Sequence, residues 1–206
     1  MMKALLIIDI QNDFLPGGAL PVAGGDQIIP LINMLQPRFD LVVATQDWHP
    51  PDHKSFASNH PGKSVFQVIN WMGGQQVLWP DHCIQGSHGA AFAAQLHLNR
   101  VETIFRKGMC PEIDSYSGFY DNGHLRSTGL ASYLKGKNAD SVYIAGLAGD
   151  YCVYFTAKDA LAEGFDTYVI EDATRSIDIA GFEKAKQDLL QHNGKLITSS
   201  EIFNRV

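Results

Sequence analysis

A chain of 206 residues that is 45% hydrophobic and 18% charged has enough apolar material for one large core. The formal net charge of −6, together with the absence of any Lys/Arg run, argues against nucleic acid or an anionic membrane surface as a partner. Because the chain has no secretory signal pattern, no apolar run long enough to cross a membrane and only three scattered cysteines, we expect a cytoplasmic protein without a disulfide framework.

Buried-strand patterns alternate with helix-like patterns along the chain. Strands are expected near 3–9, 41–46, 101–106, 142–147, 167–171 and 195–198. Helices are expected near 25–36, 88–97, 127–135, 152–163, 181–192 and, for a short last one, from Ser200. This alternation is typical of a mainly parallel sheet with helices on both faces. It predicts a single α/β domain over residues 1–206, built as a three-layer α/β/α arrangement with a six-stranded, Rossmann-like sheet.

Two of the expected strands end in residues that can carry chemistry. The apolar run 3–8 ends at Asp9 and is followed by QNDF and PGG, which are turn sequences. The strand near 101–106 is followed by Lys107. Since ligands of open parallel sheets bind at the carboxyl ends of the strands, an acid and an ammonium group are expected at the same edge of the sheet.

The long segment 48–87 interrupts the alternation and is rich in Pro, Gly, His and Asn. A loop of this length inside a compact domain is usually functional. Asp47 and His49 lie two residues apart at the end of the second strand, so their side chains can point to one face and share an ion. His82 could close the site from the far side of the insert. From spacing alone, ordinary surface polar residues are the more frequent reading of such a pattern.

One cysteine lies where a strand turns into a helix. The sequence GLAGDYCV at 146–153 follows a buried strand, and the residues after Val153 have helical spacing. Cys152 would then lie in the first helical turn, where unpaired N–H groups and the helix dipole favour a thiolate and a developing oxyanion. Taken by itself, this segment fits a nucleophile and a packed core thiol about equally.

Five blocks of sequence, in this order between Ala4 and about Asp172, carry a family resemblance: LLIIDIQNDFLPGGAL, TQDWHPPDHKSFASNH, VLWPDHCIQGS, RKGMCPEIDSYSGFYDN and GLAGDYCVYFTAKDAL. Together they resemble the nicotinamidases of the isochorismatase-like cysteine hydrolases. Any one block would be weak evidence, whereas several in the same order are specific. The resemblance implies the isochorismatase-like fold and the hydrolysis of nicotinamide to nicotinate and ammonia in NAD salvage, with pyrazinamide as a second substrate.

By this resemblance Asp9, Lys107 and Cys152 form a catalytic triad that acts through a cysteine thioester. The backbone N–H groups of Ala148 and Cys152 would bind the oxyanion, and the peptide bond that enters Ala148 would be cis. The family more often has threonine where this chain has Gly149, which predicts a more flexible loop before the nucleophile.

The resemblance also implies which residues bind a metal ion and which line the substrate pocket. One divalent metal ion, most simply zinc with iron or manganese left open, would be bound by Asp47, His49 and His82. Two further residues, His53 and Ser55, would contact this ion through water or orient its ligands. Three aromatic residues resemble those that wall the family's substrate pocket: Phe14, Trp79 and Tyr116.

Three other readings stay open at this point. An isochorismatase shares the fold but needs neither a cysteine nucleophile nor the metal-ligating pair with a WPxHC partner. An N-carbamoyl amidase would keep the triad without the full metal set, and a silent metal-binding or redox protein would not aim Asp9 and Lys107 at Cys152. The expected partner is a small-molecule substrate. The sequence leaves the oligomeric state open, a homo-oligomer included.

Overall fold

The structure, a computed structural model, describes residues 2–204 and contains one six-stranded sheet and one two-stranded hairpin. The strands are β1 (Met2–Ile8), β2 (Leu41–Asp47), β3 (Val68–Trp71), β4 (Gly74–Val77), β5 (Thr103–Lys107), β6 (Ala139–Gly146), β7 (Asp166–Thr174) and β8 (Lys195–Ile197). The α-helices are α1 (Ile29–Leu35), α2 (Leu130–Gly136), α3 (Tyr154–Ala162), α4 (Ile179–Gln191) and α5 (Ser199–Phe203). All six strands expected from the sequence are therefore present.

The six-stranded sheet is parallel throughout and has the strand order β5-β2-β1-β6-β7-β8. The order reverses between β1 and β6, and this switch point is where doubly wound sheets bind their ligands. The register brings the strand ends together, because Asp47 of β2 pairs with Lys107 of β5 while Ile8 of β1 pairs with Gly146 of β6. Side chains that follow these four strands consequently share one edge of the sheet.

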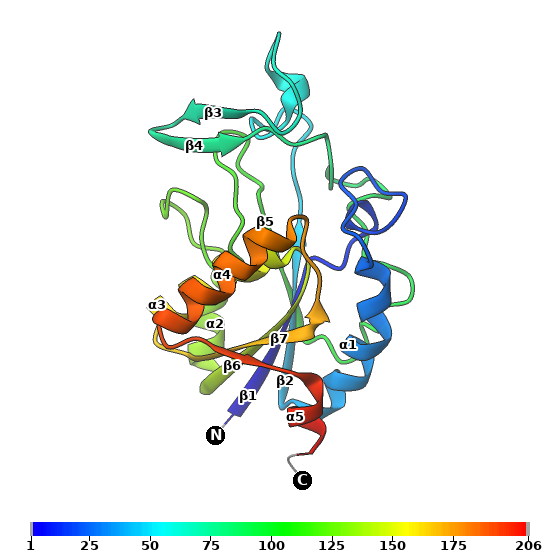
Figure 1. Cartoon of the computed structure of the whole chain (residues 1–206), viewed down its shortest axis with the longest axis vertical. Coiled ribbons are helices and arrows are strands. Elements are labelled where there is room, and N and C mark those ends of the chain that lie inside the picture. Colours follow the sequence, from blue (N-terminus) through cyan, green and yellow to red (C-terminus); the bar gives the residue numbers. More distant parts are fainter. Residues whose placement is uncertain (1, 205–206) are drawn as a thin grey trace.

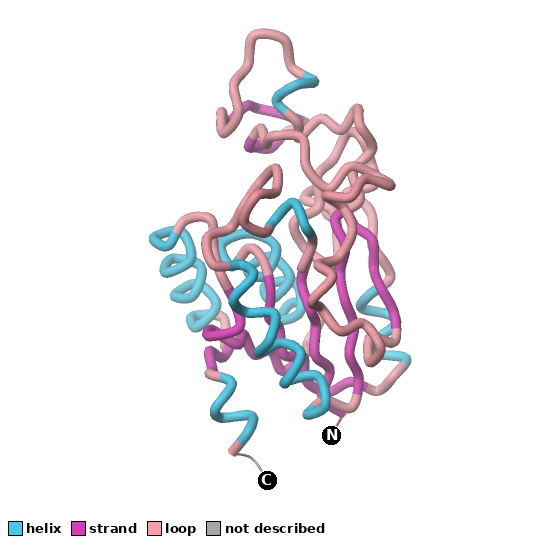
Figure 2. Tube along the Cα trace, turned by 90° about the vertical axis from the view of Figure 1, so that its right-hand side faces the viewer, coloured by secondary structure: helices cyan, strands magenta, loops and turns pink. Residues whose placement is uncertain are grey.

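Helices cover both faces of the sheet, as expected (Figure 1). Alternate side chains of β1 point to opposite faces, so that Leu5 and Ile7 pack in the cluster with α1 and α5, whereas Leu6 and Ile8 pack in the cluster with α2, α3 and α4. The three-layer α/β/α prediction is confirmed. The loops gather at the carboxyl ends of the strands, above the layers in Figure 2.

The helix expected over 88–97 is wrong, because this segment consists of turns and irregular backbone. Its carbonyls are used by the loop after β1: the N–H groups of Asn12 and Asp13 donate to the carbonyls of Ala91 and Gly89. Carbonyls committed to another segment are not available to a regular helical ladder. The apolar residues of this segment are buried instead: Ala90, Ala93 and Leu96 belong to the same core cluster as residues of α1.

The insert also differs from a plain loop, since it contains the β3–β4 hairpin, which the sequence analysis did not predict. The hairpin lies away from the main sheet, above the carboxyl ends of its strands (Figure 1). Within residues 2–204 no helix combines the length and the apolar composition that a membrane crossing requires.

Candidate active site

Side chains from three strand ends meet at the switch point of the sheet. Asp9 follows β1, Lys107 ends β5, and Cys152 lies in the turn after β6. The Lys107 Nζ atom is 2.9 Å from Asp9 Oδ2 and donates to Cys152 Sγ at 3.4 Å. All three side chains are buried. The structure therefore brings together an acid, an ammonium group and a thiol that lie far apart in the sequence.

Burial raises the pKa of both acidic members of this group. The pKa of Asp9 is raised by loss of solvent, partly offset by the charge of Lys107. The Thr45 hydroxyl donates to Asp9 Oδ1 at 2.7 Å and orients the carboxylate. The pKa of Cys152 is also raised well above its usual value by burial, even though Lys107 lowers it. The expectation of an easily ionised thiol is therefore wrong for the resting site, which holds a protonated Cys152 beside a carboxylate able to accept its proton.

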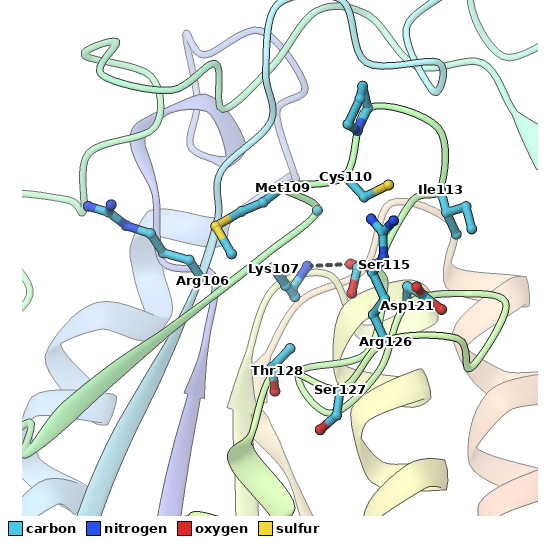
Figure 3. A pocket seen from close by; sticks show the side chains of 12 residues that line it. Arg106, Lys107, Met109, Cys110, Ile113, Ser115, Asp121, Arg126, Ser127 and Thr128 are labelled. Atoms are coloured by element: carbon cyan, nitrogen blue, oxygen red, sulfur yellow. Dashed lines mark hydrogen bonds between the residues drawn. The ribbon is translucent and has the colours of Figure 1, made fainter.

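Lys107 is the charged link between the two parts of the site. Burial opposes its charge, but the carboxylates of Asp47 and Asp9 outweigh that cost and raise the pKa of Lys107 well above its usual value. Its Nζ atom also donates to the Ser115 carbonyl at 2.9 Å, as Figure 3 shows, and to Asp47 Oδ1 at 2.6 Å. Lys107 is consequently a fixed cation that faces two carboxylates and the thiol.

Cys152 is presented by a π-helical turn over Gly149–Val153, which runs directly into α3. The peptide bond between Leu147 and Ala148 is cis. Gly149 donates its N–H to the Arg175 carbonyl at 2.7 Å, and a Cβ at Gly149 would lie 3.0 Å from the ring of Phe182. The absence of a side chain at Gly149 therefore permits close packing against α4, and the expectation of a loosened loop is not supported.

The three metal-ligand candidates also lie side by side. Asp47 Oδ2 is 3.5 Å from His49 Nε2 and 3.9 Å from His82 Nε2. The opposite ring nitrogens are anchored by backbone, because His49 Nδ1 is 2.9 Å from the Gly108 carbonyl and His82 Nδ1 is 2.8 Å from the Pro80 carbonyl. A carbonyl can only accept, so each Nδ1 carries a proton and each Nε2 faces the carboxylate. One carboxylate and two imidazoles arranged in this way fit a divalent ion with open positions.

Electrostatics within this cluster favour the ligand forms of Asp47 and His82 but not that of His49. Burial would raise the pKa of Asp47, but Lys107 and His49 outweigh it and keep the carboxylate ionised. Burial lowers the pKa of His82, which leaves that ring neutral. Burial would also lower the pKa of His49, but the Asp47 carboxylate outweighs it and raises the value, so His49 must give up a proton before it binds an ion.

His53 and Ser55 lie behind the three candidates. The Ser55 N–H donates to His53 Nδ1 at 3.1 Å, and the Ser55 Oγ atom is 2.7 Å from the same nitrogen. The proton of the neutral ring is therefore on Nε2, which is buried and has no hydrogen-bond partner within residues 2–204. Burial lowers the pKa of His53 to about 4. The centroid of the His53 ring lies 4.4 Å from that of the His49 ring.

The three aromatic residues expected in the pocket line one small cavity together with Cys152, Asp47 and His82. The ring of Phe14 lies 5.5 Å from that of His82, and Trp79 Nε1 donates to the Tyr116 hydroxyl at 3.2 Å. The cavity leaves about 20 Å³ for a water-sized group, roughly the space of one water molecule. A flat aromatic ring would therefore need these side chains to move apart.

A larger cleft, with about 290 Å³ of space, is lined in part by Lys107 and Ser115 (Figure 3). Its walls come from residues 106–115 and 121–128, and they do not include Cys152 or the metal-ligand candidates. The smaller cavity is therefore the candidate substrate pocket, despite its size.

Comparison with known proteins identifies the family. The isochorismatase domain family matches residues 3–201. A nicotinamidase from Acinetobacter baylyi is 50% identical over 201 residues, which cover 97% of this chain and 94% of that protein. A solved nicotinamidase and pyrazinamidase from Acinetobacter baumanii is similar with a TM-score of 0.95 at 50% identity, and the match covers 97% of each chain. The chain belongs to the nicotinamidase family.

A more distant member of the nicotinamidase family bears on the metal cluster. The pyrazinamidase of Pyrococcus horikoshii, solved in complex with zinc, has a TM-score of 0.79 and 37% identity to this chain. The match covers 96% of this chain and 99% of that one. The family resemblance read from the sequence is thus confirmed, and a relative with the same fold is known to bind zinc.

Several residues around this nicotinamidase-family site escaped the sequence analysis. Tyr151 and Ile177 line the small cavity, and the buried Asp114 lies close to His49 and His53. Tyr151 could have been found, since it adjoins the nucleophile candidate. Ile177 and Asp114 carry no signal in the sequence, because loops that are distant along the chain bring them to the site.

Proposed function

We propose that this protein hydrolyses nicotinamide to nicotinate and ammonia, and that it also accepts pyrazinamide. The observation that supports this most directly is the contact of Lys107 Nζ with Asp9 at 2.9 Å and with Cys152 at 3.4 Å, beside a pocket walled by aromatic rings. An amide bond is cleaved by such a nucleophile, base and cation without any redox cofactor. The reaction belongs to NAD salvage, and we expect it in the cytoplasm.

In the proposed mechanism Asp9 first removes the proton of the Cys152 thiol. Both side chains contact Lys107 Nζ, and the raised pKa of Asp9 makes it a stronger base than an exposed carboxylate. Lys107 then faces the new thiolate and offsets its charge. The thiolate attacks the carboxamide carbon, and its electron pair forms the carbon–sulfur bond while the carbonyl oxygen becomes an oxyanion.

The oxyanion would be stabilised by the backbone N–H groups of Ala148 and Cys152, which adjoin the attacking sulfur. Asp9 returns its proton to the departing nitrogen, so that the carbon–nitrogen bond breaks and ammonia leaves. Asp9 next takes a proton from a water molecule, whose oxygen attacks the thioester. Nicotinate is released, and Cys152 recovers its proton.

Asp47, His49 and His82 would hold one divalent ion, for which zinc is our first choice and iron or manganese also suit the ligand set. When bound, the ion would supply a Lewis acid for the ring nitrogen of the substrate. The backbone carbonyls of Gly108 and Pro80 keep both imidazoles in the ligating tautomer, and His53 with Ser55 supports His49 from behind. Phe14, Trp79 and Tyr116 would sandwich the flat ring.

The test is ammonia release from nicotinamide by the purified protein, compared with the Cys152→Ala variant. We expect turnover by the unmutated protein and none above background by the variant. A thiol alkylator should modify Cys152 and abolish activity, and substrate should protect against it. Substantial activity in Cys152→Ala would refute the thioester mechanism, and absence of nicotinamide hydrolysis by the metal-loaded, unmutated protein would refute the proposed function. A small-molecule substrate is the only partner the proposal requires.

A further inference from the structure

The loop that follows β1 contains a glutamine whose side chain forms hydrogen bonds with the backbone of a metal-ligand candidate. Gln11 is fully buried. Its Oε1 atom accepts the N–H of Asp47 at 2.8 Å, and its Nε2 atom donates to the Asp47 carbonyl, also at 2.8 Å. The same Nε2 donates to the Ala90 carbonyl at 2.9 Å. A side-chain amide is the group that can accept and donate side by side, so Gln11 replaces a strand partner at the point where β2 ends.

Two residues further on, a carboxylate holds the second ligand segment. Asp13 Oδ2 accepts the backbone N–H of Cys83 at 2.7 Å, and Cys83 directly follows His82. Asp13 Oδ1 accepts the N–H of Ala19 at 3.2 Å. A Cβ at Gly89 would lie 2.0 Å from Asp13 Oδ2, so the backbone of Gly89 closes over the carboxylate and limits its motion.

We propose that Gln11 and Asp13 are positioning residues that hold the ligands Asp47 and His82 in place from the loop that begins with the base Asp9. This inference rests on the proposed function, because it takes the metal site as assigned there. Neither Gln11 nor Asp13 is required to touch substrate or ion. Their effect is to make the chain segment of the catalytic base also determine the geometry of the metal ligands.

The two carboxylate oxygens of Asp47 have different partners, and this explains why its backbone must be held in place. Oδ1 accepts from Lys107 at 2.6 Å, while Oδ2 faces His49 and His82. A rotation of the Asp47 backbone would move both oxygens and break both sets of contacts. Gln11 bonds to the N–H and the carbonyl of Asp47 and thereby opposes that rotation.

The experiment measures Zn²⁺ affinity of the full chain by competition with a chromophoric chelator. Gln11→Met keeps the length of the side chain but removes both hydrogen-bonding groups, and we expect Zn²⁺ binding to weaken about tenfold or more. The matched control is Gln46→Met, since Gln46 is also buried and donates to the same Ala90 carbonyl at 2.9 Å without bonding to Asp47. The control should stay within about twofold of the unmutated protein. Excess Zn²⁺ should restore nicotinamide hydrolysis in Gln11→Met, which a general folding defect would not allow.

The Asp13→Asn variant tests the inference independently of Gln11 and leaves the core unchanged. Its amide would turn a donor toward the N–H of Cys83 or Ala19, and we again expect about tenfold weaker Zn²⁺ binding. Asp81→Asn removes the same charge beside His82 without a bond to Cys83, and it should stay within about twofold.

The inference is overturned if Gln11→Met and Asp13→Asn bind Zn²⁺ within twofold of the unmutated protein, or if their controls weaken equally. Should Gln11→Met not fold, the comparison of Asp13→Asn with Asp81→Asn decides by the same criterion. An unmutated protein that binds no Zn²⁺ would instead overturn the proposed metal site, and the positioning role with it. The two failures are therefore distinguishable.

Discussion

The two halves of the site are built in different ways. In the triad half, Asp9, Lys107 and Cys152 lie within or just after strands β1, β5 and β6, so the register of the sheet sets their spacing. In the metal half, His49 and His82 belong to the insert, and the Nδ1 atom of each ring is anchored by a hydrogen bond to a backbone carbonyl. Damage to the first half should therefore stop the chemistry, whereas damage to the second should first weaken ion binding.

Lys107 contacts both halves, through Asp9 and Asp47. Its replacement should have the largest effect on activity and stability. Lys107→Met leaves the buried carboxylates of Asp9 and Asp47 without their cation, so we expect the rate to fall by several orders of magnitude and the free energy of unfolding by about 3 to 5 kcal/mol. Kinetics and chemical denaturation measure both.

The control for that variant is Lys158→Met, which breaks an exposed pair with Asp188 at 3.6 Å and should cost at most about 1 kcal/mol. Zn²⁺ affinity should fall in Lys107→Met as well, because Asp47 loses a partner. If metal affinity and Cys152 alkylation rate were both unchanged, the two halves would be independent.

A substrate series separates the halves without changing the protein. Benzamide has the carboxamide that Cys152 would attack but no ring nitrogen for the metal half. We expect its kcat/KM to be about a hundredfold below that of nicotinamide, since a lost contact of a few kcal/mol costs a factor of ten per 1.36 kcal/mol. Pyrazinamide keeps the nitrogen and should react well. Equal efficiency on benzamide would mean that the metal half does not position the substrate.

Gly108→Ala should damage the metal half selectively. Gly108 has φ +66°, and a Cβ there would lie 2.3 Å from the His49 ring, so alanine must displace that ligand. We expect Zn²⁺ affinity to fall about tenfold to a hundredfold. Gly62→Ala is the control, because Gly62 has φ +75° but its Cβ would meet nothing within 4 Å. An equal loss in both variants would assign the effect to backbone strain alone.

The smallest expected effect is the pH dependence of ion binding. Since Asp47 raises the pKa of His49 above 6.5, bound Zn²⁺ must displace a proton, and affinity should fall by up to about tenfold per pH unit as pH decreases through that raised value. His82, whose pKa is lowered, adds to this loss only at lower pH. Chelator competition between pH 5.5 and 8 measures it, and a flat profile would contradict the proton displacement.

In the metal-free protein, the contribution of His49 to the free energy of unfolding should increase as pH decreases, whereas ion binding weakens. A folded-state pKa above the unfolded value stabilises the fold at pH values below about 6.5, and this contribution is lost as pH rises through the folded-state pKa. Denaturation of the metal-free protein across the same pH range tests the sign.

The sequence by itself determined the six strands and the residues at their ends, because apolar runs such as 3–8 and 142–145 can satisfy their backbone only inside a covered parallel sheet. It also specified the family, through several blocks in one order. It failed over 88–97, where an apolar pattern is the same for a helix and for irregular chain buried against α1.

Only the tertiary structure decided which groups touch. The sheet order β5-β2-β1 lets the Lys107 side chain of the edge strand reach both Asp47 and Asp9, and no local pattern in the chain encodes that arrangement. The same holds for the pKa of Cys152, which the position before a helix predicts to be low and which burial raises. The reason is physical: helix and strand patterns depend on near neighbours, whereas desolvation and ion pairing depend on atoms that meet only when distant segments pack together.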